Sequence, residues 1–353
     1  MSVAGFEWCV WVLLTTFLAG TGPGERLSRF EYAETHMGSL FKIVLYSPDE
    51  ATARRASRSA FDRIAALDAS FSDYQPDSEL MRLCDKAGGP AVPVSKDLID
   101  ILQQSRSMFE SSGGAFDATV GPVVRLWRRA RRDGKMPSAE NLRRARALVS
   151  SNLVKIDPKA RTIRLLEPNM KLDLGGIAKG YASSAAIATL KSQGITLALV
   201  AGAGDIVVSG PPPGREGWSI GVAPLDDPTR RPGRHLLLHD AAVSTSGDAE
   251  RFVVIDGKRY SHIVDPRTGL GVVDRCSVTV VADDGAKADA LATAVFVLGP
   301  ERGLALVGSV KGANVLIVRS ENGASKTYES PGFRTQPRAS AEGASETSLS
   351  TKP

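Results

Sequence analysis

The sequence predicts an α+β protein in which a mostly antiparallel sheet packs against helices. Short apolar segments typical of strands gather in the second half of the chain, after residue 196, and helix-periodic segments lie before and between them. The chain has 353 residues, of which 42% are hydrophobic and 24% are charged. This composition is that of an ordinary globular protein that can bury a large core, as one large domain or two smaller ones.

The first expected elements are one strand and three helices. Residues 35–46 favour a strand because β-branched and aromatic side chains fill their second half. Residues 51–71 favour a helix because small and apolar side chains recur on one helical face. Residues 95–112, which a glycine pair would end, and residues 178–193 are two more amphipathic segments. The later elements are strands at 197–202, 206–208, 218–222, 242–244, 251–255, 276–281 and 315–318, a helix from Ala286 and a core segment at 303–306.

The two ends of the chain differ from its centre. Residues 1–24 are an apolar segment that ends in small residues, as in a secretory signal peptide. The start of a signal peptide is normally basic, whereas here it has no Lys or Arg and contains Glu7. The run is too short to span a membrane comfortably. Thr21 stands where a bacterial lipoprotein signal has its cysteine, so a lipoprotein cysteine is absent. We expect an exported, periplasmic protein, its association with the inner membrane left open, with a folded domain at 25–330 and a disordered tail at 331–353.

The net charge of +5 is unevenly distributed, because residues 125–146 alone hold nine basic side chains. A solvated helix pair around residues 133–137 is the simpler interpretation of this segment. The functional interpretation is a patch for phosphate, nucleic acid or anionic lipid. Nucleic acid is disfavoured because Trp127 is the only aromatic residue among the arginines.

The three cysteines have no zinc-binding or CxxC spacing. Cys9 lies in the signal-like segment. Cys84 and Cys276 could form one disulfide, but we expect two free thiols.

The most informative motif is SHIVDPRTG, from Ser261 to Gly269. It brings a histidine, an aspartate, an arginine and a turn-forming proline within nine residues, so their polar groups can converge on a ligand at a surface turn. The alternative is that His262 only caps the turn at Asp265 and Pro266.

Two oxygen-bearing side chains, Asp289 and Thr293, follow this motif. They are four residues apart in a helix-like segment, 286–296, so both leave the same helical face about one turn apart. Carboxylate and hydroxyl oxygens suit a hard cation such as Mg²⁺.

A second motif is LDLGGIAKGYA, at residues 172–182. A strand-like start meets two glycines and continues as a helix, whose free N–H groups can bind an anion. Lys179 in the first helical turn can neutralise phosphate. The alternative is an ordinary strand–turn–helix corner with a surface lysine.

Weaker indications come from three further places. In the loop 113–122, Asp117 and Thr119 could hold polar ligand atoms, or Asp117 could cap a helix. Met37 could pack on a flat ring or simply belong to the core. Tyr74, in a turn, could stack on a base or a flavin, or cover an edge of the core.

In this order the motifs resemble the ApbE family, the flavin transferases that use FAD to modify proteins. The resemblance extends from Thr35 to about Val318, and it implies an ApbE-like, T-fold-related architecture with an FAD-binding domain at 25–330. Ser39 replaces the threonine expected by the family pattern, which keeps the hydroxyl. The matching segments are 37–39, 71–74, 116–122, 173–181, 244–248, 262–269 and 288–293.

The resemblance also implies the roles of individual residues. Gly176 would offer its backbone carbonyl to Mg²⁺, with Asp289 and Thr293 as side-chain ligands. His262 would lie near the pyrophosphate as the catalytic base, and Asp265 is the nearest alternative base. The residues implied to contact FAD are Met37, Tyr74, Ala115, Phe116, Asp117, Asp173, Lys179, His262 and Ile263.

The activity implied by the resemblance is Mg²⁺-dependent transfer of FMN from FAD to a Thr or Ser hydroxyl of an acceptor protein, with release of AMP. The implied acceptors are flavoprotein subunits of membrane-associated electron-transfer complexes, and nucleic acid is not an expected partner. Two alternatives stay open. One is a Mg²⁺-dependent FAD pyrophosphatase giving FMN and AMP, and the other is a non-catalytic flavin carrier in the cell envelope.

Overall fold

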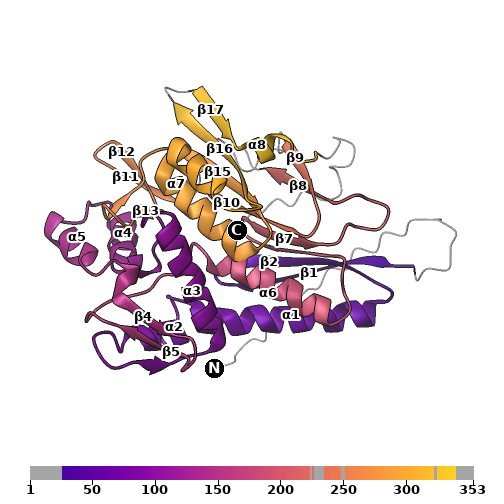
Figure 1. Cartoon of the computed structure of the whole chain (residues 1–353), viewed down its shortest axis with the longest axis horizontal. Coiled ribbons are helices and arrows are strands. Elements are labelled where there is room, and N and C mark those ends of the chain that lie inside the picture. Colours follow the sequence, from indigo (N-terminus) through magenta and orange to yellow (C-terminus); the bar gives the residue numbers. More distant parts are fainter. Residues whose placement is uncertain (1–25, 223–224, 226–233, 248–250, 322–323, 339–353) are drawn as a thin grey trace, which may run out of the picture.

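The computed structural model describes residues 26–222, 225, 234–247, 251–321 and 324–338. Its centre is an eight-stranded sheet in the order β1-β2-β6-β7-β10-β15-β16-β17, in which every neighbouring pair is antiparallel (Figure 1). Its strands are β1 (Ser28–His36), β2 (Ser39–Ser47), β6 (Ala198–Gly202), β7 (Asp205–Ser209), β10 (Ala241–Gly247), β15 (Cys276–Ala282), β16 (Asn314–Glu321) and β17 (Ala324–Glu329). The prediction of an α+β fold with a mostly antiparallel sheet is confirmed.

Helices cover one face of this sheet. α1 packs on α6, α6 on α7, and α3 on α7 (Figure 1). Because side chains alternate along a strand, Ile43 points into this helical layer and its neighbour Val44 points to the other face. The helices are α1 (Glu50–Phe71), α2 (Glu79–Cys84), α3 (Lys96–Ser111), α4 (Gly121–Asp133), α5 (Ala139–Arg146), α6 (Ala178–Ser192), α7 (Gly285–Gly308) and α8 (Pro331–Arg334), with short 3-10 turns η1 (Ala118–Val120) and η2 (Ser151–Leu153).

The other face of the sheet is covered by a strand hairpin and α8. Trp218 in the hairpin and Phe333 in α8 are buried against this face. The smaller sheets are β8 (Trp218–Val222) with β9 (Arg234–Leu238); β11 (Phe252–Ile255) with β12 (Lys258–Ser261); β13 (Val264–Asp265) with β14 (Leu270–Gly271); and β3 (Val92–Pro93), β5 (Thr162–Leu165) and β4 (Val154–Asp157) in the order β3-β5-β4.

The folded chain extends beyond residue 330, where the sequence analysis placed the start of a disordered tail. Phe333 is fully buried, and Leu237 N–H donates to the carbonyl of Pro337 at 2.9 Å. The sequence did not indicate this ordered segment because Phe333 is the one aromatic residue in it that packs into the core. Residues 339–353 and the signal-like segment 1–24 lie outside the described residues.

Two local corrections concern turns. The single strand expected at 35–46 is the second half of a hairpin, in which Met37 (φ 50°) and Gly38 (φ 66°) form a two-residue turn between β1 and β2. Methionine rarely adopts positive φ, so this turn had no sequence signal. The helix from Ala286 continues to Gly308, past a break at Gly299 and Pro300, and includes the core segment expected at 303–306.

Helix α7 has the length and apolarity of a membrane span, but half of its most apolar stretch is buried inside the protein. Its apolarity therefore reflects packing on the sheet and on α6. Cys84 and Cys276 are both buried thiols, and no disulfide joins them, as expected.

The strand register places the β1–β2 turn and the β6–β7 turn at one end of the main sheet. Phe41 of β2 pairs with Gly202 of β6, which pairs with Asp205 of β7, which in turn pairs with Ser244 of β10. The turn at Met37 therefore lies at the same end as Asp205. The first turns of α6 and α7 meet nearby, where a Cβ atom on Gly180 would approach the carbonyl oxygen of Gly285 to 2.0 Å.

Candidate active site

The site is centred on Lys179, in the first turn of α6. Its Nζ lies 3.4 Å from Oδ2 of Asp205 and 3.4 Å from the carbonyl oxygen of Gly175. Burial alone would lower the pKa of Lys179, but the carboxylates of Asp205 and Asp289 more than offset this and raise it. Lys179 is therefore a permanent cation beside the glycine-rich entry to α6, as its sequence motif predicted.

Asp205 is the acidic partner that the sequence analysis missed. It is buried at the first position of β7, and Oδ1 accepts a hydrogen bond from Ser244 Oγ at 2.5 Å. The only sequence signal was an aspartate placed directly before the apolar run 206–208. Its relation to Lys179 depends on sheet register, which a single sequence does not encode locally.

Asp289 is the second buried acid of this cluster. Its Oδ2 accepts the N–H of Gly180 at 3.2 Å. Burial and the neighbouring Asp205 raise the pKa of Asp289 to about 7, while Lys179 and the Gly180 N–H act in the opposite direction. Two carboxylates share one lysine here, so the cluster has an excess of negative charge that a bound cation would relieve.

The structure brings the three residues expected to bind the metal close to one another. Asp289 and Thr293 lie on α7, and Thr293 Oγ1 is 2.9 Å from the position of a Cβ atom on Gly176. Ser246 Oγ lies 3.5 Å from Thr293 Oγ1. In the part of the chain that the structure describes, no group of three or more His, Cys, Asp and Glu side chains is placed to hold a metal ion. A carbonyl, a hydroxyl and a carboxylate are the oxygen donors that Mg²⁺ prefers.

His262 follows β12 directly and has a defined tautomer. Its Nδ1 lies 3.0 Å from the carbonyl oxygen of Arg251, which can only accept, so Nδ1 holds the proton and Nε2 has a free lone pair. Burial lowers the pKa of His262 to about 4, with further lowering by the charges of Arg251, Arg131 and Lys179 and an opposing effect of the Arg251 hydrogen bond. The half-buried imidazole is thus neutral at physiological pH and surrounded by cations.

The carboxylate of Asp265, the alternative base, is occupied by hydrogen bonds to Arg267. Its two oxygens accept from Nε and Nη2 of Arg267, both at 2.9 Å, and Oδ1 also accepts the Arg267 N–H. Its backbone carbonyl accepts N–H bonds from Thr268 and Gly269. Asp265 therefore holds the turn, and the geometry favours His262 as the base. The neighbouring Ile263 is half-buried against the main core.

A second charged group lies beside Tyr74. Arg128 of α4 donates to Asp73 and, at 3.0 Å, to Oδ2 of Asp173, and its guanidinium carbon lies 4.2 Å from the Tyr74 ring centroid. Burial and the charge of Asp73 raise the pKa of Asp173, against the effect of Arg128. Tyr74 is 73% exposed, so its second ring face is open to a ligand. The sequence analysis placed Arg128 only within a basic segment.

The remaining predicted contacts differ in what they offer. Phe116 approaches Gly176, since a Cβ atom there would lie 3.3 Å from its ring, and Ala115 is buried beside it. The carboxylate of Asp117 accepts from Thr119 N and Oγ1 and from Ser151 N and Oγ, at 2.7–3.0 Å. The Asp117 carboxylate therefore caps η1 and connects it to η2 by hydrogen bonds, which is a structural role. Met37 N–H donates to Asp68 Oδ2 at 2.8 Å, and its side chain packs against the main core.

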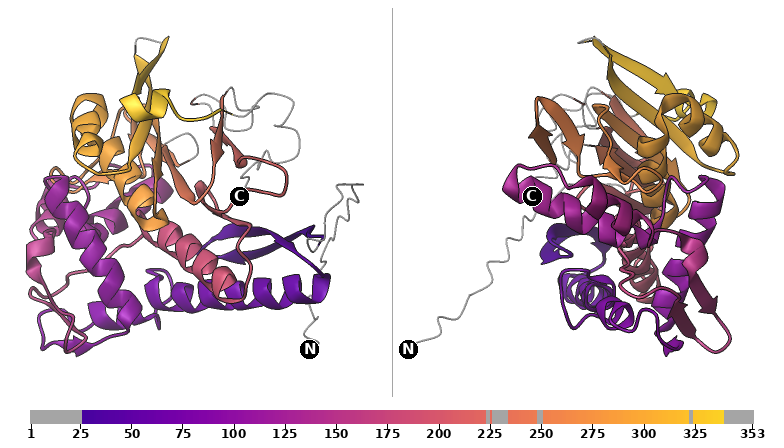
Figure 2. Two further views of the ribbon diagram at one scale, coloured as in Figure 1. Left: turned by 45° about the vertical axis from the view of Figure 1, so that its right-hand side comes forward. Right: turned by 90° about the vertical axis from the view of Figure 1, so that its left-hand side faces the viewer.

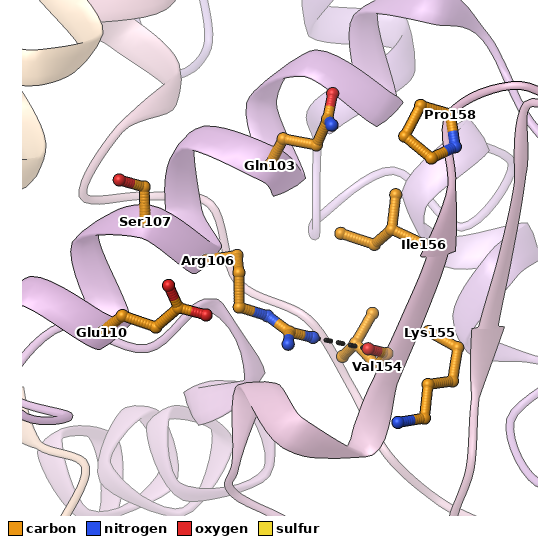
Figure 3. Close-up of a pocket in the computed structure, with 8 residues that line it drawn as sticks. All are labelled: Gln103, Arg106, Ser107, Glu110, Val154, Lys155, Ile156 and Pro158. Atoms are coloured by element: carbon orange, nitrogen blue, oxygen red, sulfur yellow. Dashed lines mark hydrogen bonds between the residues drawn. The ribbon is translucent and has the colours of Figure 1, made fainter.

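A cavity of about 420 Å³ lies away from these residues, between α3 and β4 (Figure 3). None of the predicted site residues lines it. Arg106 points across it and donates to the carbonyl of Val154, which fixes α3 to β4. We regard it as a groove between packed elements.

The fold and the charged centre beside the glycine-rich start of α6 define an α+β protein with a candidate site for a phosphate-bearing ligand. A family model described as the ApbE family matches residues 37–317. The chain belongs to the ApbE family.

Known relatives and solved structures agree with this assignment. An FAD:protein FMN transferase of Treponema pallidum (strain Nichols) is 31% identical over 326 residues, covering 87% of this chain and 90% of its own. An FAD:protein FMN transferase of Klebsiella pneumoniae (strain 342) is 33% identical over 278 residues, covering 78% and 84%. The solved structure of the flavin transferase ApbE from Vibrio cholerae has a TM-score of 0.80 at 29% identity, covering 88% of this chain and 100% of that one.

Proposed function

We propose that the chain transfers FMN from FAD to a Thr or Ser hydroxyl of an acceptor protein and releases AMP, in a Mg²⁺-dependent reaction. The observation that carries this proposal is the cluster of Lys179 with Asp205 and Asp289 beside Gly176 and Thr293. It joins a permanent cation, hard oxygen donors and a helix start in one place, and each of the three suits the binding of a pyrophosphate or its metal ion.

The donor set fits Mg²⁺. Asp289, Thr293 and the carbonyl of Gly176 would hold the ion, and the negative charge that Asp205 and Asp289 share favours a divalent cation there. When bound, Mg²⁺ neutralises charge on phosphoryl oxygens.

The side chains of the chain would act on the rest of the reaction. Lys179 would bind a pyrophosphate oxygen, and Tyr74 would offer its open ring face to a flat part of FAD. Nε2 of His262 would accept the proton of the acceptor hydroxyl, whose oxygen forms a bond to the phosphorus on the FMN side. The bond from that phosphorus to the oxygen of the AMP phosphate breaks, and AMP leaves with the electron pair.

The experiment incubates the protein with FAD and Mg²⁺, with and without an acceptor protein, and measures AMP, free FMN and the mass of the acceptor. Transfer predicts AMP together with an acceptor whose mass rises by one FMN unit. Free FMN with AMP and an unmodified acceptor would favour the pyrophosphatase, in which water replaces the hydroxyl. Tight FAD binding without AMP release, even with Mg²⁺, would favour a non-catalytic carrier.

The proposal extends to the setting of the reaction. Membrane-associated electron-transfer subunits are the acceptors we propose, and the signal-like residues 1–24 support export to the periplasm. The N-terminal sequence of the mature protein, isolated from its own cells, tests the export. FAD would then have to reach the enzyme outside the cytoplasm.

A further inference from the structure

The α4–α5 hairpin is the most strongly charged part of the chain. Residues 121–146 contain nine basic and two acidic side chains, a net charge of +7 against +5 for the whole sequence. The two acids form ion pairs with Arg132 and Arg144. The hairpin therefore keeps a large positive excess at the protein surface.

The basic side chains divide between the two sides of the hairpin. Arg128 and Arg131 are partly buried and face the site, where they influence Asp173 and His262. Arg129, Lys135 and Arg143 are exposed, and none of them has a carboxylate within ion-pair distance among the described residues. This outer set of cations is free to meet an anionic partner.

Exposed apolar side chains lie on the hairpin and on the β11–β12 ribbon that packs against it. Met136, between α4 and α5, is 38% exposed. In the β11–β12 ribbon the outward positions hold Phe252, 36% exposed, and Val254, 54% exposed, whereas Val253 and Ile255 point inward. If the outer face of this ribbon contacted only water, polar residues would be favoured at these positions.

The hairpin and the ribbon form one end of the molecule. α4 packs against β11, and the Trp127 and Tyr260 rings lie 5.0 Å apart in the cluster that joins them. Both elements face the viewer in the right-hand view of Figure 2. We use "basic end" for residues 121–146 together with 252–261.

We propose that the basic end is a peripheral docking surface for a bilayer that contains anionic phospholipids. Exposed cations attract anionic headgroups, and protruding apolar side chains enter the boundary between headgroups and acyl chains. Nucleic acid would bind the same cations but would also use open aromatic faces. Trp127 is buried with its indole N–H on the carbonyl of Gly269, at 2.9 Å, and the guanidinium carbon of Arg259 lies 3.2 Å from the Phe252 ring centroid. The inference does not depend on the flavin chemistry.

Docking in this way would place the site beside the membrane surface. His262 follows β12 directly, and its backbone N–H pairs with Arg251 at the start of the ribbon. His262 is thus joined to the basic end by chain continuity with β12, and the cluster of Trp127 and Tyr260 packs the ribbon on α4.

The test measures co-sedimentation of the full chain with phosphatidylcholine vesicles that contain about one-third phosphatidylglycerol, and with pure phosphatidylcholine vesicles. We expect binding to be much tighter to the anionic vesicles, and lost when the ionic strength rises from about 0.1 M to about 1 M. Reversing three exposed cations, Arg129→Glu, Lys135→Glu and Arg143→Glu, should weaken partitioning by more than about 100-fold, since each cation contributes about 5-fold. Val254→Ser should weaken it several-fold without changing its salt dependence.

The matched control reverses three exposed cations of the β4–β5 hairpin, which lies below α4 and α5 in Figure 1: Lys155→Glu, Lys159→Glu and Arg161→Glu. This variant changes the net charge by the same amount as the first triple variant, and it should keep most of the binding to anionic vesicles. Equal loss in both triple variants would mean that net charge alone acts, and would overturn the proposal. So would equal binding to neutral and anionic vesicles, or hairpin-dependent binding to duplex DNA with none to vesicles.

Discussion

Thr293 Oγ1 lies 2.9 Å from the position that a Cβ atom on Gly176 would occupy. The entry to α6 can therefore approach α7 closely only because residue 176 has no side chain. The same approach brings the backbone of Gly176 to the two oxygen-bearing residues of α7. Gly176 thus serves both the packing of the helices and the geometry of the proposed metal site.

Gly176→Ala should weaken both. Forcing a methyl group against Thr293 and the Phe116 ring should lower the free energy of unfolding by about 1–3 kcal/mol. It should also raise the Mg²⁺ concentration needed for AMP release from FAD. Gly308→Ala is the control, because a Cβ atom there would meet nothing within 4 Å. Similar Mg²⁺ requirements for wild type and Gly176→Ala would contradict the role of this close approach.

Asp289→Ala should nearly abolish turnover, whether the chain is a transferase or a pyrophosphatase. Loss of residues that merely support a metal ligand costs about 10–100-fold, so loss of the carboxylate ligand should cost at least about 100-fold in AMP release. Excess Mg²⁺ should recover part of the rate. Full activity in Asp289→Ala, measured at saturating FAD, would remove Asp289 from the metal site.

The pH dependence should follow His262. Because the pKa of His262 is lowered to about 4, the rate of AMP release with acceptor, measured at saturating Mg²⁺, should stay level from neutral pH down to about 5 and fall below that. Saturating Mg²⁺ is needed because burial and Asp205 raise the pKa of Asp289, a proposed ligand, to about 7, and a bound cation favours its ionised form. His262→Gln should lower the rate by about 10²–10⁴-fold and remove this dependence. A rate that falls already near pH 6.5, the ordinary pKa of histidine, would show that the imidazole is not shielded.

The same residue links stability to pH. Between about pH 4 and 6.5 the unfolded chain binds a proton at His262 that the folded chain does not bind. Its contribution to stability is therefore present above pH 6.5 and is lost as the pH falls toward 4. Urea unfolding of wild type and His262→Gln at both ends of this range should show a steeper decline for wild type.

Features encoded in local sequence were predicted well. The amphipathic periods gave α1, α3 and α6 nearly to their ends, and the four-residue spacing of Asp289 and Thr293 placed both on one face of α7. Lys179 was found because its glycine-rich motif is continuous in the chain.

The missed features depend on tertiary contacts. Asp205 meets Lys179 only through the register of β6, β7 and β10, and Arg128 meets Asp173 across 45 residues of sequence. The β1–β2 turn needs Met37 at positive φ, against its ordinary preference. In the first two cases the deciding interaction joins residues far apart in the sequence, and in the third a local turn adopts a conformation that its residue type disfavours.

The bridge made by Arg128 gives the last prediction. Its guanidinium holds Asp73 and Asp173 together, and Asp173 is largely buried. Arg128→Met would leave two close carboxylates without a cation, one of them buried, and removing one partner of a buried pair costs about 3–5 kcal/mol. Since Arg128 is partly exposed, we expect the substitution to lower the free energy of unfolding by about 3 kcal/mol, the low end of this range. FAD binding should weaken as well, because Tyr74 loses the cation that packs on its ring.

Arg129→Met is the matched control, since Arg129 is the next residue of α4, is exposed, and has no carboxylate partner among the described residues. It should change the unfolding free energy by no more than about 0.5 kcal/mol. Adding Asp73→Asn to Arg128→Met should restore part of the loss, because it removes the repulsion between the two carboxylates. Urea unfolding measures all three variants, and FAD titration followed by flavin fluorescence measures binding. Equal stability of Arg128→Met and Arg129→Met would mean that the bridge adds nothing to the fold, while unchanged FAD affinity would separate Tyr74 and Asp173 from the FAD site.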